Sequence, residues 1–437
     1  GVYVIPAIYA ECCGVLTHTI PTTAYRGAGR PEATYTIERV IDVAARELNI
    51  DPYELRRRNL IPPEAMPYRT ALTFVYDCGE FEDNMKMAAG LADLEGFQAR
   101  CAEARKAGKL RGIGICNGIE VAGGPFLGPG KDMARLRLAA DGSLVLSTGT
   151  MSTGQGLETA FCQLVAAKFG VAPERVRYRQ GDTDDLAYGR GNGGSSSMCT
   201  GASAVWLAAE KLIESAKSVA ADGLEAAVED LTFEAGVFTI SGTDRSIDLA
   251  TVARMAEDRA HASPGTGAGL MEIGEFTPSA VTYPNGTHIC EVEIDPDTGV
   301  TEVVRYSAVE DLGAILNPML VAGQLHGGIT QGIGQAIGEE IVHDRASGQL
   351  LTASFMDYQM PRAADLPDFR LATREVLTKA NPVGAKGVGE AGTVGALAAA
   401  TNAVNAALAP LGIRHFDMPA TPARVWQAIQ AAKSASG

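Results

Sequence analysis

The sequence lacks the spacings that mark several common metal and hydrolase sites. Its eight cysteines form no Cys-x-x-Cys pair, and its six histidines form no His-Glu-x-x-His motif. There is also no Gly-x-Ser-x-Gly segment. These absences argue against a zinc ribbon, a zincin and an α/β-hydrolase, because each of those sites needs its ligands or nucleophile at a fixed spacing.

Basic residues and long apolar runs are also scarce. The chain has 37 Lys and Arg against 52 Asp and Glu, a net charge of −15. The basic residues form no stripe, so binding of a nucleic-acid backbone is not expected. No window reaches about 18 uninterrupted apolar residues, the usual length of a membrane span. The nearest, residues 394–409, is broken by Asn402 and Asn405, and we expect no membrane span.

Most cysteines sit in apolar surroundings, as in Phe161-Cys162. We interpret them as buried free thiols of a reducing compartment, which predicts a cytoplasmic protein. A periplasmic location stays open if a partner carries an export signal.

Glycine is present in excess, at 50 of 437 residues, about 11% against an average of roughly 7%. Such clusters predict loops whose backbone closely approaches another group. The run at 123–130 is interpreted as a substrate-side loop. The clusters lie at residues 27–29, 123–130, 154–156, 189–194, 323–338 and 384–395.

The remaining pattern predicts an α+β fold of mixed-sheet and helix subdomains. Residues 134–148 form a hairpin pattern, and a Gly/Gln loop and a helix follow. Residues 290–306 and the helix that begins near Gly323 repeat that layout. We infer a weak internal repeat and an α+β architecture. A strongly amphipathic helix at 200–220 follows Ser195, Ser196 and Ser197, whose hydroxyls lie where a helix start favours anions.

Gly387, Gly389 and Gly392 match the dinucleotide pattern G-x-G-x-x-G. The match is weak, because that fingerprint needs a hydrophobic strand directly before it. Glu390, framed by these glycines and near Lys386, is either a helix-capping carboxylate or a functional acid.

Arg26 lies between Tyr25 and the glycines at 27 and 29, just before a predicted helix. Rigid backbone on both sides would present its guanidinium in a fixed position.

Taken in order, these motifs resemble the molybdenum-binding subunit of the xanthine oxidase family. The resemblance covers essentially the whole chain and implies the C-terminal portion of that subunit, because the family's earlier Gly-Gly-x-Phe-Gly loop is absent. It implies that residues 1–109 complete a first molybdopterin-binding domain. Residues 110–437 then form the second, as pseudo-repeated subdomains at about 110–265 and 266–437. The matching motifs are residues 24–32, 153–156, 194–197, 323–324 and 387–390.

The resemblance also implies roles for single residues. Glu390 matches the family's catalytic glutamate, the base toward a molybdenum-bound hydroxide, and Arg26 matches an arginine that orients substrate. The metal would be held by the pterin dithiolene, with no direct protein ligand. The residues implied to bind the cofactor are Gln155, Gly156, Ser195, Ser196, Ser197, Gln324, Lys386, Gly387 and Gly389. The cofactor implied is molybdopterin cytosine dinucleotide.

One departure narrows the expected reaction. Carbon monoxide dehydrogenases of the family place a Cys directly after the loop arginine to hold copper, whereas this chain has Gly27. The resemblance therefore favours hydroxylation of an N-heteroaromatic ring or oxidation of an aldehyde.

The expected partners are a chain with the N-terminal half of the subunit, an iron–sulfur subunit with [2Fe-2S], and an FAD subunit. Two alternatives remain open: an inactive or structural fragment of such a subunit, and an NAD(P)-dependent dehydrogenase that uses the Gly387–Gly392 motif.

Overall fold

The computed structural model describes residues 1–124, 130–262 and 269–436. The helices are α1 Arg30–Leu48, α2 Pro52–Asn59, α3 Phe81–Ala92, α4 Phe97–Lys106, α5 Leu157–Phe169, α6 Ala202–Leu224, α7 Leu249–Ala262, α8 Pro318–Ile337, α9 Ala391–Leu408 and α10 Pro422–Ser436. The strands are β1 Tyr68–Arg69, β2 Val75–Tyr76, β3 Leu110–Ile119, β4 Asp132–Leu138, β5 Leu144–Thr148, β6 Val176–Gln180, β7 Leu231–Glu234, β8 Val237–Ile240, β9 Ser246–Asp248, β10 Leu270–Phe276, β11 Asn285–Ile294, β12 Thr301–Asp311 and β13 Phe369–Arg374.

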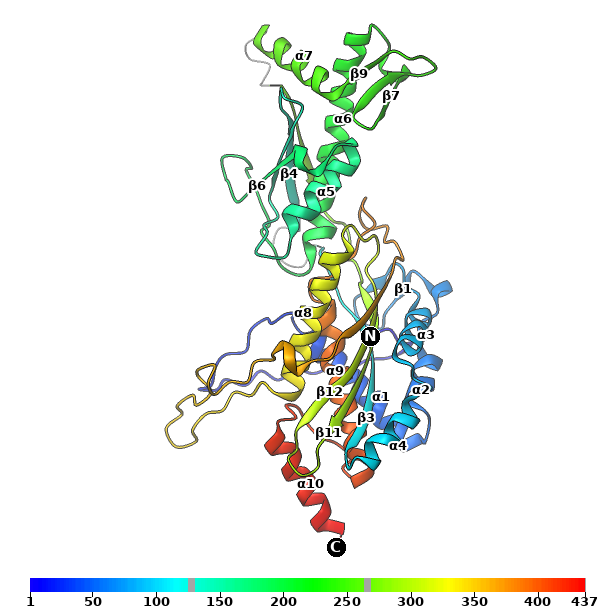
Figure 1. Ribbon diagram of the computed structural model, residues 1–437, viewed down its shortest axis with the longest axis vertical. Coiled ribbons are helices and arrows are strands. Elements are labelled where there is room, and N and C mark those ends of the chain that lie inside the picture. The colour runs from blue at the N-terminus through cyan, green and yellow to red at the C-terminus, as the bar shows by residue number, and fades with distance from the viewer. Residues whose placement is uncertain (125–129, 263–268, 437) are drawn as a thin grey trace.

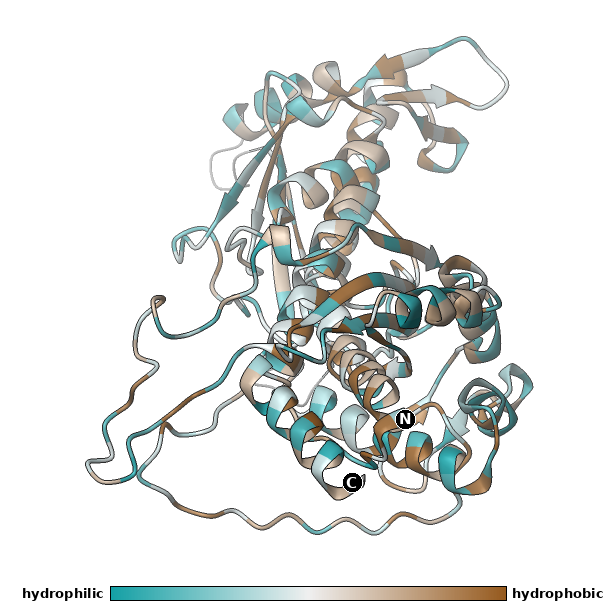
Figure 2. Ribbon diagram, turned by 60° about the horizontal axis from the view of Figure 1, so that its bottom comes forward, coloured by the Kyte–Doolittle hydropathy of each residue, from teal (hydrophilic) through white to brown (hydrophobic). Residues whose placement is uncertain are grey.

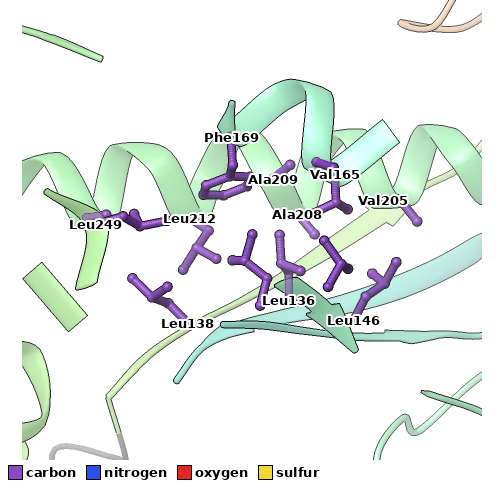
Figure 3. Packing of buried hydrophobic residues seen from close by; sticks show 14 of the residues in the cluster. Leu136, Leu138, Leu146, Val165, Phe169, Val205, Ala208, Ala209, Leu212 and Leu249 are labelled. Carbon is purple, nitrogen blue, oxygen red and sulfur yellow. The ribbon is translucent and has the colours of Figure 1, made fainter. Parts of the chain in front are cut away.

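The molecule is elongated and has two lobes, each built on a four-stranded mixed sheet (Figure 1). In the first lobe the strand order is β10-β4-β5-β6. Alternate residues of β4 and β5 point toward α5 and α6, because side chains of a strand alternate between faces. Leu136 and Leu146 thus meet Val205, Ala208 and Leu212 of α6 (Figure 3). The mixed helix and sheet content confirms the predicted α+β class.

In the second lobe the strand order is β13-β12-β11-β3, and helices cover both faces. Cys116 and Cys290 belong to the apolar cluster that includes α8 and α9, whereas their strand neighbours Ile115 and Ile289 pack with α3. The nearly continuous burial of β11 follows from this double cover.

The two lobes have the same topology. In each, two antiparallel strands are followed by a helix, a third strand parallel to the second, and a second helix that crosses the sheet: β4-β5-α5-β6-α6 and β11-β12-α8-β13-α9. The predicted internal repeat is therefore present.

The outer strands are exchanged between the lobes. β3 directly precedes the first repeat but pairs with β11, and β10 directly precedes the second repeat but pairs with β4. The subdomain boundaries predicted near residues 110 and 265 did not anticipate this exchange. Each of β3 and β10 belongs by sequence to one predicted subdomain and pairs with the sheet of the other. The domain limits themselves stay a prediction.

Each long crossing helix approaches its outer strand at a glycine. A Cβ at Gly114 of β3 would overlap the Ala399 carbonyl oxygen of α9, and a Cβ at Gly274 of β10 would overlap the Ala204 carbonyl oxygen of α6. Only glycine permits this distance between helix and strand.

Two segments without helix or regular strand, residues 5–24 and 338–362, leave the body of the molecule on the same side (Figures 1 and 2). They expose large apolar side chains, including Leu16 and Met356. Cys12 and Cys13 also lie here and are exposed, so the expectation that the thiols are mostly buried is wrong for these two.

By length and composition, the segment Ala391–Leu411 that contains α9 is apolar enough to span a membrane. It is 78% buried inside the protein, between the second sheet and α8, which is the position of a core helix. Asn402 and Asn405, which interrupt its apolar run, accept hydrogen bonds from the Arg39 guanidinium of α1.

Candidate active site

Four segments that are far apart in the sequence meet between the lobes. They are the loop before α1, the turn before α6, the first half of α8, and the turn before α9. Because α6 and α9 occupy equivalent places in the two repeats, the starts of both long helices lie at this junction.

Glu390 is the N-cap residue of α9, but its side chain makes no hydrogen bond to its own helix. Its Oε1 accepts a hydrogen bond from the Gly27 backbone N–H at 2.9 Å, and its Oε2 accepts one from the Ser195 hydroxyl at 3.1 Å. The carboxylate is therefore fixed by two neutral donors from other segments, which decides against a simple helix cap.

Arg26 is held by groups of the protein itself. Its Nε donates to the Gly389 carbonyl oxygen at 2.5 Å, and its two terminal nitrogens donate to the side chains of Gln331, at 3.1 Å, and Gln324, at 2.8 Å. Burial lowers the pKa of Arg26 from its usual value, and the Glu390 charge opposes that shift. Through these contacts, Arg26 links the loop before α1 to α8 and to the turn before α9.

The three serines have different surroundings. Ser195 has a positive φ of 50°, and its hydroxyl donates to Glu390. Ser196 is buried, and its hydroxyl donates to the Gly193 carbonyl oxygen at 2.7 Å. Ser197 begins the π-helical turn Ser197–Gly201 that leads into α6.

A cavity of about 110 Å³ lies at this junction, and Gly389, the residue before Glu390, is part of its lining. It brings together predicted cofactor-binding residues of both lobes. Its lining includes Gln155, Ser195, Ser197, Gln324, Lys386, Gly387 and Gly389. Arg26, Gly156, Ser196 and Glu390 are not part of the lining.

Glycines keep the walls of the cavity close together. A Cβ at Gly387 would come within 2.5 Å of the Ser195 Cβ, and a Cβ at Gly156 would come within 2.6 Å of a Leu320 methyl group. Gly156 therefore lets α5 approach α8 and does not itself contact the cavity.

The Lys386 side chain, predicted to bind the cofactor, forms a buried ion pair. Its ammonium donates to Asp311 Oδ2 at 2.5 Å, and both side chains are completely buried. Asp311 also accepts the backbone N–H groups of Gly313 and Val376. Lys386 thus lines the cavity, while its ammonium group is paired with the buried Asp311 carboxylate.

Sequence reasoning missed Glu120, which follows β3 and is 1% exposed. It lies beside Glu390 and Ser195. Burial and the Glu390 charge raise the pKa of Glu120 well above its usual value. An acidic residue at the end of the apolar run of β3 was the available signal.

The dinucleotide motif lacks the context that it needs. Residues 375–390, all described, contain no strand, so Gly387, Gly389 and Gly392 do not follow a strand into α9. The glycine run at 123–130 lies mostly outside the described residues.

The donor set fits a cofactor that brings its own metal ligands. Within the described ranges, no group of three His, Cys, Asp or Glu is placed to hold a metal ion. The cavity wall is mostly aliphatic, and amides and hydroxyls, among them those of Gln155, Gln324 and Ser197, are interspersed in it. A pterin that carries molybdenum on a dithiolene would find hydrogen-bond partners in these amides and hydroxyls and would need no metal ligand from the protein.

Comparison with protein families gives the class directly. Residues 87–367 match a molybdopterin cofactor-binding domain, and residues 1–60 match a second domain of the same description. The chain therefore belongs to the molybdopterin-binding family of molybdenum subunits that includes xanthine dehydrogenase.

Individual relatives agree with this family. The chain is 37% identical to the carbon monoxide dehydrogenase large chain of Hydrogenophaga pseudoflava over 98% of its own length and 55% of that relative. It is 35% identical to the nicotine 6-hydroxylase large subunit of Paenarthrobacter nicotinovorans, over 98% and 54%. Quinoline 2-oxidoreductase from Pseudomonas putida 86 superposes with a TM-score of 0.84 and 36% identity, over 93% and 53%. The chain spans about half the length of these relatives.

Proposed function

We propose that this chain is the cofactor-binding and catalytic part of a molybdenum hydroxylase, and that its inter-lobe cavity binds molybdopterin cytosine dinucleotide. The observation that carries the proposal is Glu390, which is fixed by Gly27 and Ser195 and directly follows Gly389 of the cavity wall. That wall is mostly aliphatic but includes amides and hydroxyls from both repeats.

When bound, the cofactor supplies a two-electron oxidation that uses oxygen from water. Gln155, Gln324 and the Gly387–Gly389 backbone, which line the cavity together with Ser197, would hold its pterin portion. Glu390 accepts the proton that the reaction releases, at a carboxylate oxygen held by Gly27 N–H or Ser195 Oγ. Arg26 acts indirectly, by fixing Gly389 and α8 around that carboxylate.

We base the proposed substrate class on Gly27. Its φ is +107°, and a Cβ there would lie 2.5 Å from Pro31 Cδ. A cysteine side chain does not fit this loop, so the copper-binding arrangement of a carbon monoxide dehydrogenase is not available. We assign the site to an N-heteroaromatic ring or an aldehyde, and two of the compared relatives are named for nicotine and quinoline.

The proposal includes partners that carry the electrons away. These are an iron–sulfur subunit with [2Fe-2S], an FAD subunit, and the region that corresponds to the other half of the relatives' length. The free thiols support a cytoplasmic location. A second candidate is a chain that is inactive by itself, which the half-length match favours.

Metal analysis of the complete complex tests the proposal. We expect molybdenum and a releasable cytidine nucleotide, and absence of both from a folded complex would overturn it. Tight binding of NADH to the chain itself would favour a nicotinamide enzyme instead.

Turnover tests the role of Glu390. Glu390→Gln should lower kcat by about 10²–10⁴-fold with molybdenum content unchanged, because the amide cannot accept the proton. Glu375→Gln, at an exposed position, is the matched control and should keep full activity. Retained turnover in Glu390→Gln would remove Glu390 from catalysis.

A further inference from the structure

Glu120 is a buried acid beside the site, and the reaction described above has no use for it. It lies where β3 ends, and its backbone N–H donates to the Pro284 carbonyl oxygen at 2.8 Å. The side chain is 1% exposed, and neither carboxyl oxygen accepts a hydrogen bond from a donor of the described residues. An ionised carboxylate without donors is costly in such a place.

The group beside it explains how the acid is satisfied. Glu120 lies next to the Glu390 carboxyl group. The Ser195 hydroxyl is nearby too, but it donates to Glu390 Oε2. One proton between the two carboxyl groups would give Glu120 a hydrogen-bond partner and Glu390 a third donor.

We propose that Glu120 is a positioning residue that stays a neutral carboxylic acid and donates its proton as a hydrogen bond to the Glu390 carboxylate. The pair then carries a single negative charge, located on Glu390, where the proposed reaction needs a base. The protonation state of Glu120 is independent of the proposed function. Its effect on turnover rests on that function.

The surrounding groups are compatible with this state. Burial and, secondarily, the Glu390 charge raise the pKa of Glu120 well above its usual value. The other ionisable neighbours are Arg26, Arg30 and Cys199, and burial raises the pKa of the Cys199 thiol to about 12, so that it stays neutral. Arg26 is itself occupied by Gly389, Gln324 and Gln331, as described above.

Infrared difference spectroscopy detects the neutral acid directly. Wild type at pH 7 should show the C=O stretch of a protonated carboxyl group that is absent in Glu120→Gln. In Glu390→Gln the band should remain but shift, because its acceptor has changed from a carboxylate to an amide. Glu54→Gln, at a partly exposed carboxylate whose pKa is lowered to about 2 by hydrogen bonds from Arg57 and Arg58, should remove no such band. An unchanged band in Glu120→Gln would overturn the proposal.

The pH dependence of stability gives a second readout. Because the folded protein retains a proton that the unfolded chain releases above about pH 4.5, this contribution to stability is complete at low pH and is lost as the pH rises toward the folded pKa. The unfolding constant of wild type relative to Glu120→Gln should therefore increase by up to about tenfold per pH unit in that range. A ratio that does not change with pH would contradict the proposal, as would failure of Glu120→Gln to fold, since glutamine resembles the neutral acid.

The pH profile of kcat distinguishes positioning from mere packing. Glu120→Leu removes a donor from Glu390 and should move the acidic limb to higher pH, whereas Glu120→Gln keeps a donor and should leave the limb within a few tenths of a unit. If Glu120 were ionised, Glu120→Gln would move the limb to lower pH, and that result would overturn the proposal. Because the infrared band does not need turnover, its outcome separates failure of this inference from failure of the proposed function.

Discussion

Gly27 combines a conformational and a chemical role at the scale of single residues. Its φ of +107° is unfavourable for any residue with a side chain, and its N–H donates to Glu390 Oε1. Gly29, two residues later, also has a positive φ, of 92°, but an added Cβ there would meet nothing within 4 Å. A side chain would thus cause backbone strain at both positions but a steric clash only at Gly27, so a comparison of the two substitutions distinguishes these effects.

Gly27→Ala should destabilise the protein more than Gly29→Ala. Backbone strain costs about 1–2 kcal/mol in each variant, and the clash with Pro31 adds about 1–3 kcal/mol in Gly27→Ala alone. The free energy of unfolding, measured with urea, checks this difference. We also expect kcat to fall only in Gly27→Ala, because only that change moves the donor to Glu390. Equal losses in both variants would show that the contact with Pro31 is unimportant.

The buried Lys386–Asp311 pair gives a second prediction for single residues. Lys386→Met leaves Asp311 charged and without its cation, which should cost about 3–5 kcal/mol of folding free energy. Lys106→Met breaks an exposed pair with Glu103 and should have no measurable effect. The double variant Lys386→Met/Asp311→Asn should recover part of the loss, and denaturant unfolding of the three proteins measures it.

At the scale of elements, local patterns in the sequence were sufficient for much of the structure. The hairpin pattern at residues 134–148 predicted the pairing of β4 and β5, and the amphipathic pattern at 200–220 predicted most of α6. The approach of Glu120 to Glu390 was not predictable in this way. It depends on which strands become neighbours, and periodicity carries no information about pairing between distant segments.

Close packing of α9 on β3 leads to a prediction for an element. Gly114→Ala should push α9 away from the sheet and destabilise the protein by about 1–3 kcal/mol. Because Glu390 is the N-cap residue of α9, the same change should also lower kcat. Gly90→Ala is the control, since Gly90 is an exposed residue of α3 with open space at its Cβ, and it should stabilise the protein by about 0.5–1 kcal/mol. Urea unfolding of both variants measures the change in the free energy of unfolding, which should be a decrease for Gly114→Ala and an increase for Gly90→Ala. No change in Gly114→Ala would show that α9 can shift without cost.

At the scale of the whole molecule, the exchange of β3 and β10 ties the two lobes together. Neither sheet is complete without a strand that comes from beside the other repeat in the sequence. The site lies between the lobes, with Ser195 from one and Glu390 from the other. If the lobes could move apart freely, that contact would not stay in place. Because the outer strands are exchanged, separating the lobes would break the pairing of β3 with β11 and of β10 with β4.

The exchange predicts that both lobes unfold in one transition. The chain has two tryptophans, Trp206 on α6 of the first lobe and Trp426 on α10 of the second. Fluorescence of Trp426→Phe therefore reports on the first lobe, and that of Trp206→Phe on the second. We expect each fluorescence midpoint to coincide with the midpoint measured by circular dichroism on the same variant. The reason is that unfolding of either sheet releases a strand that is joined along the chain to the other lobe. Two separate midpoints would show that each lobe holds its sheet without the exchanged strand, and the lobes would then be independent folding units.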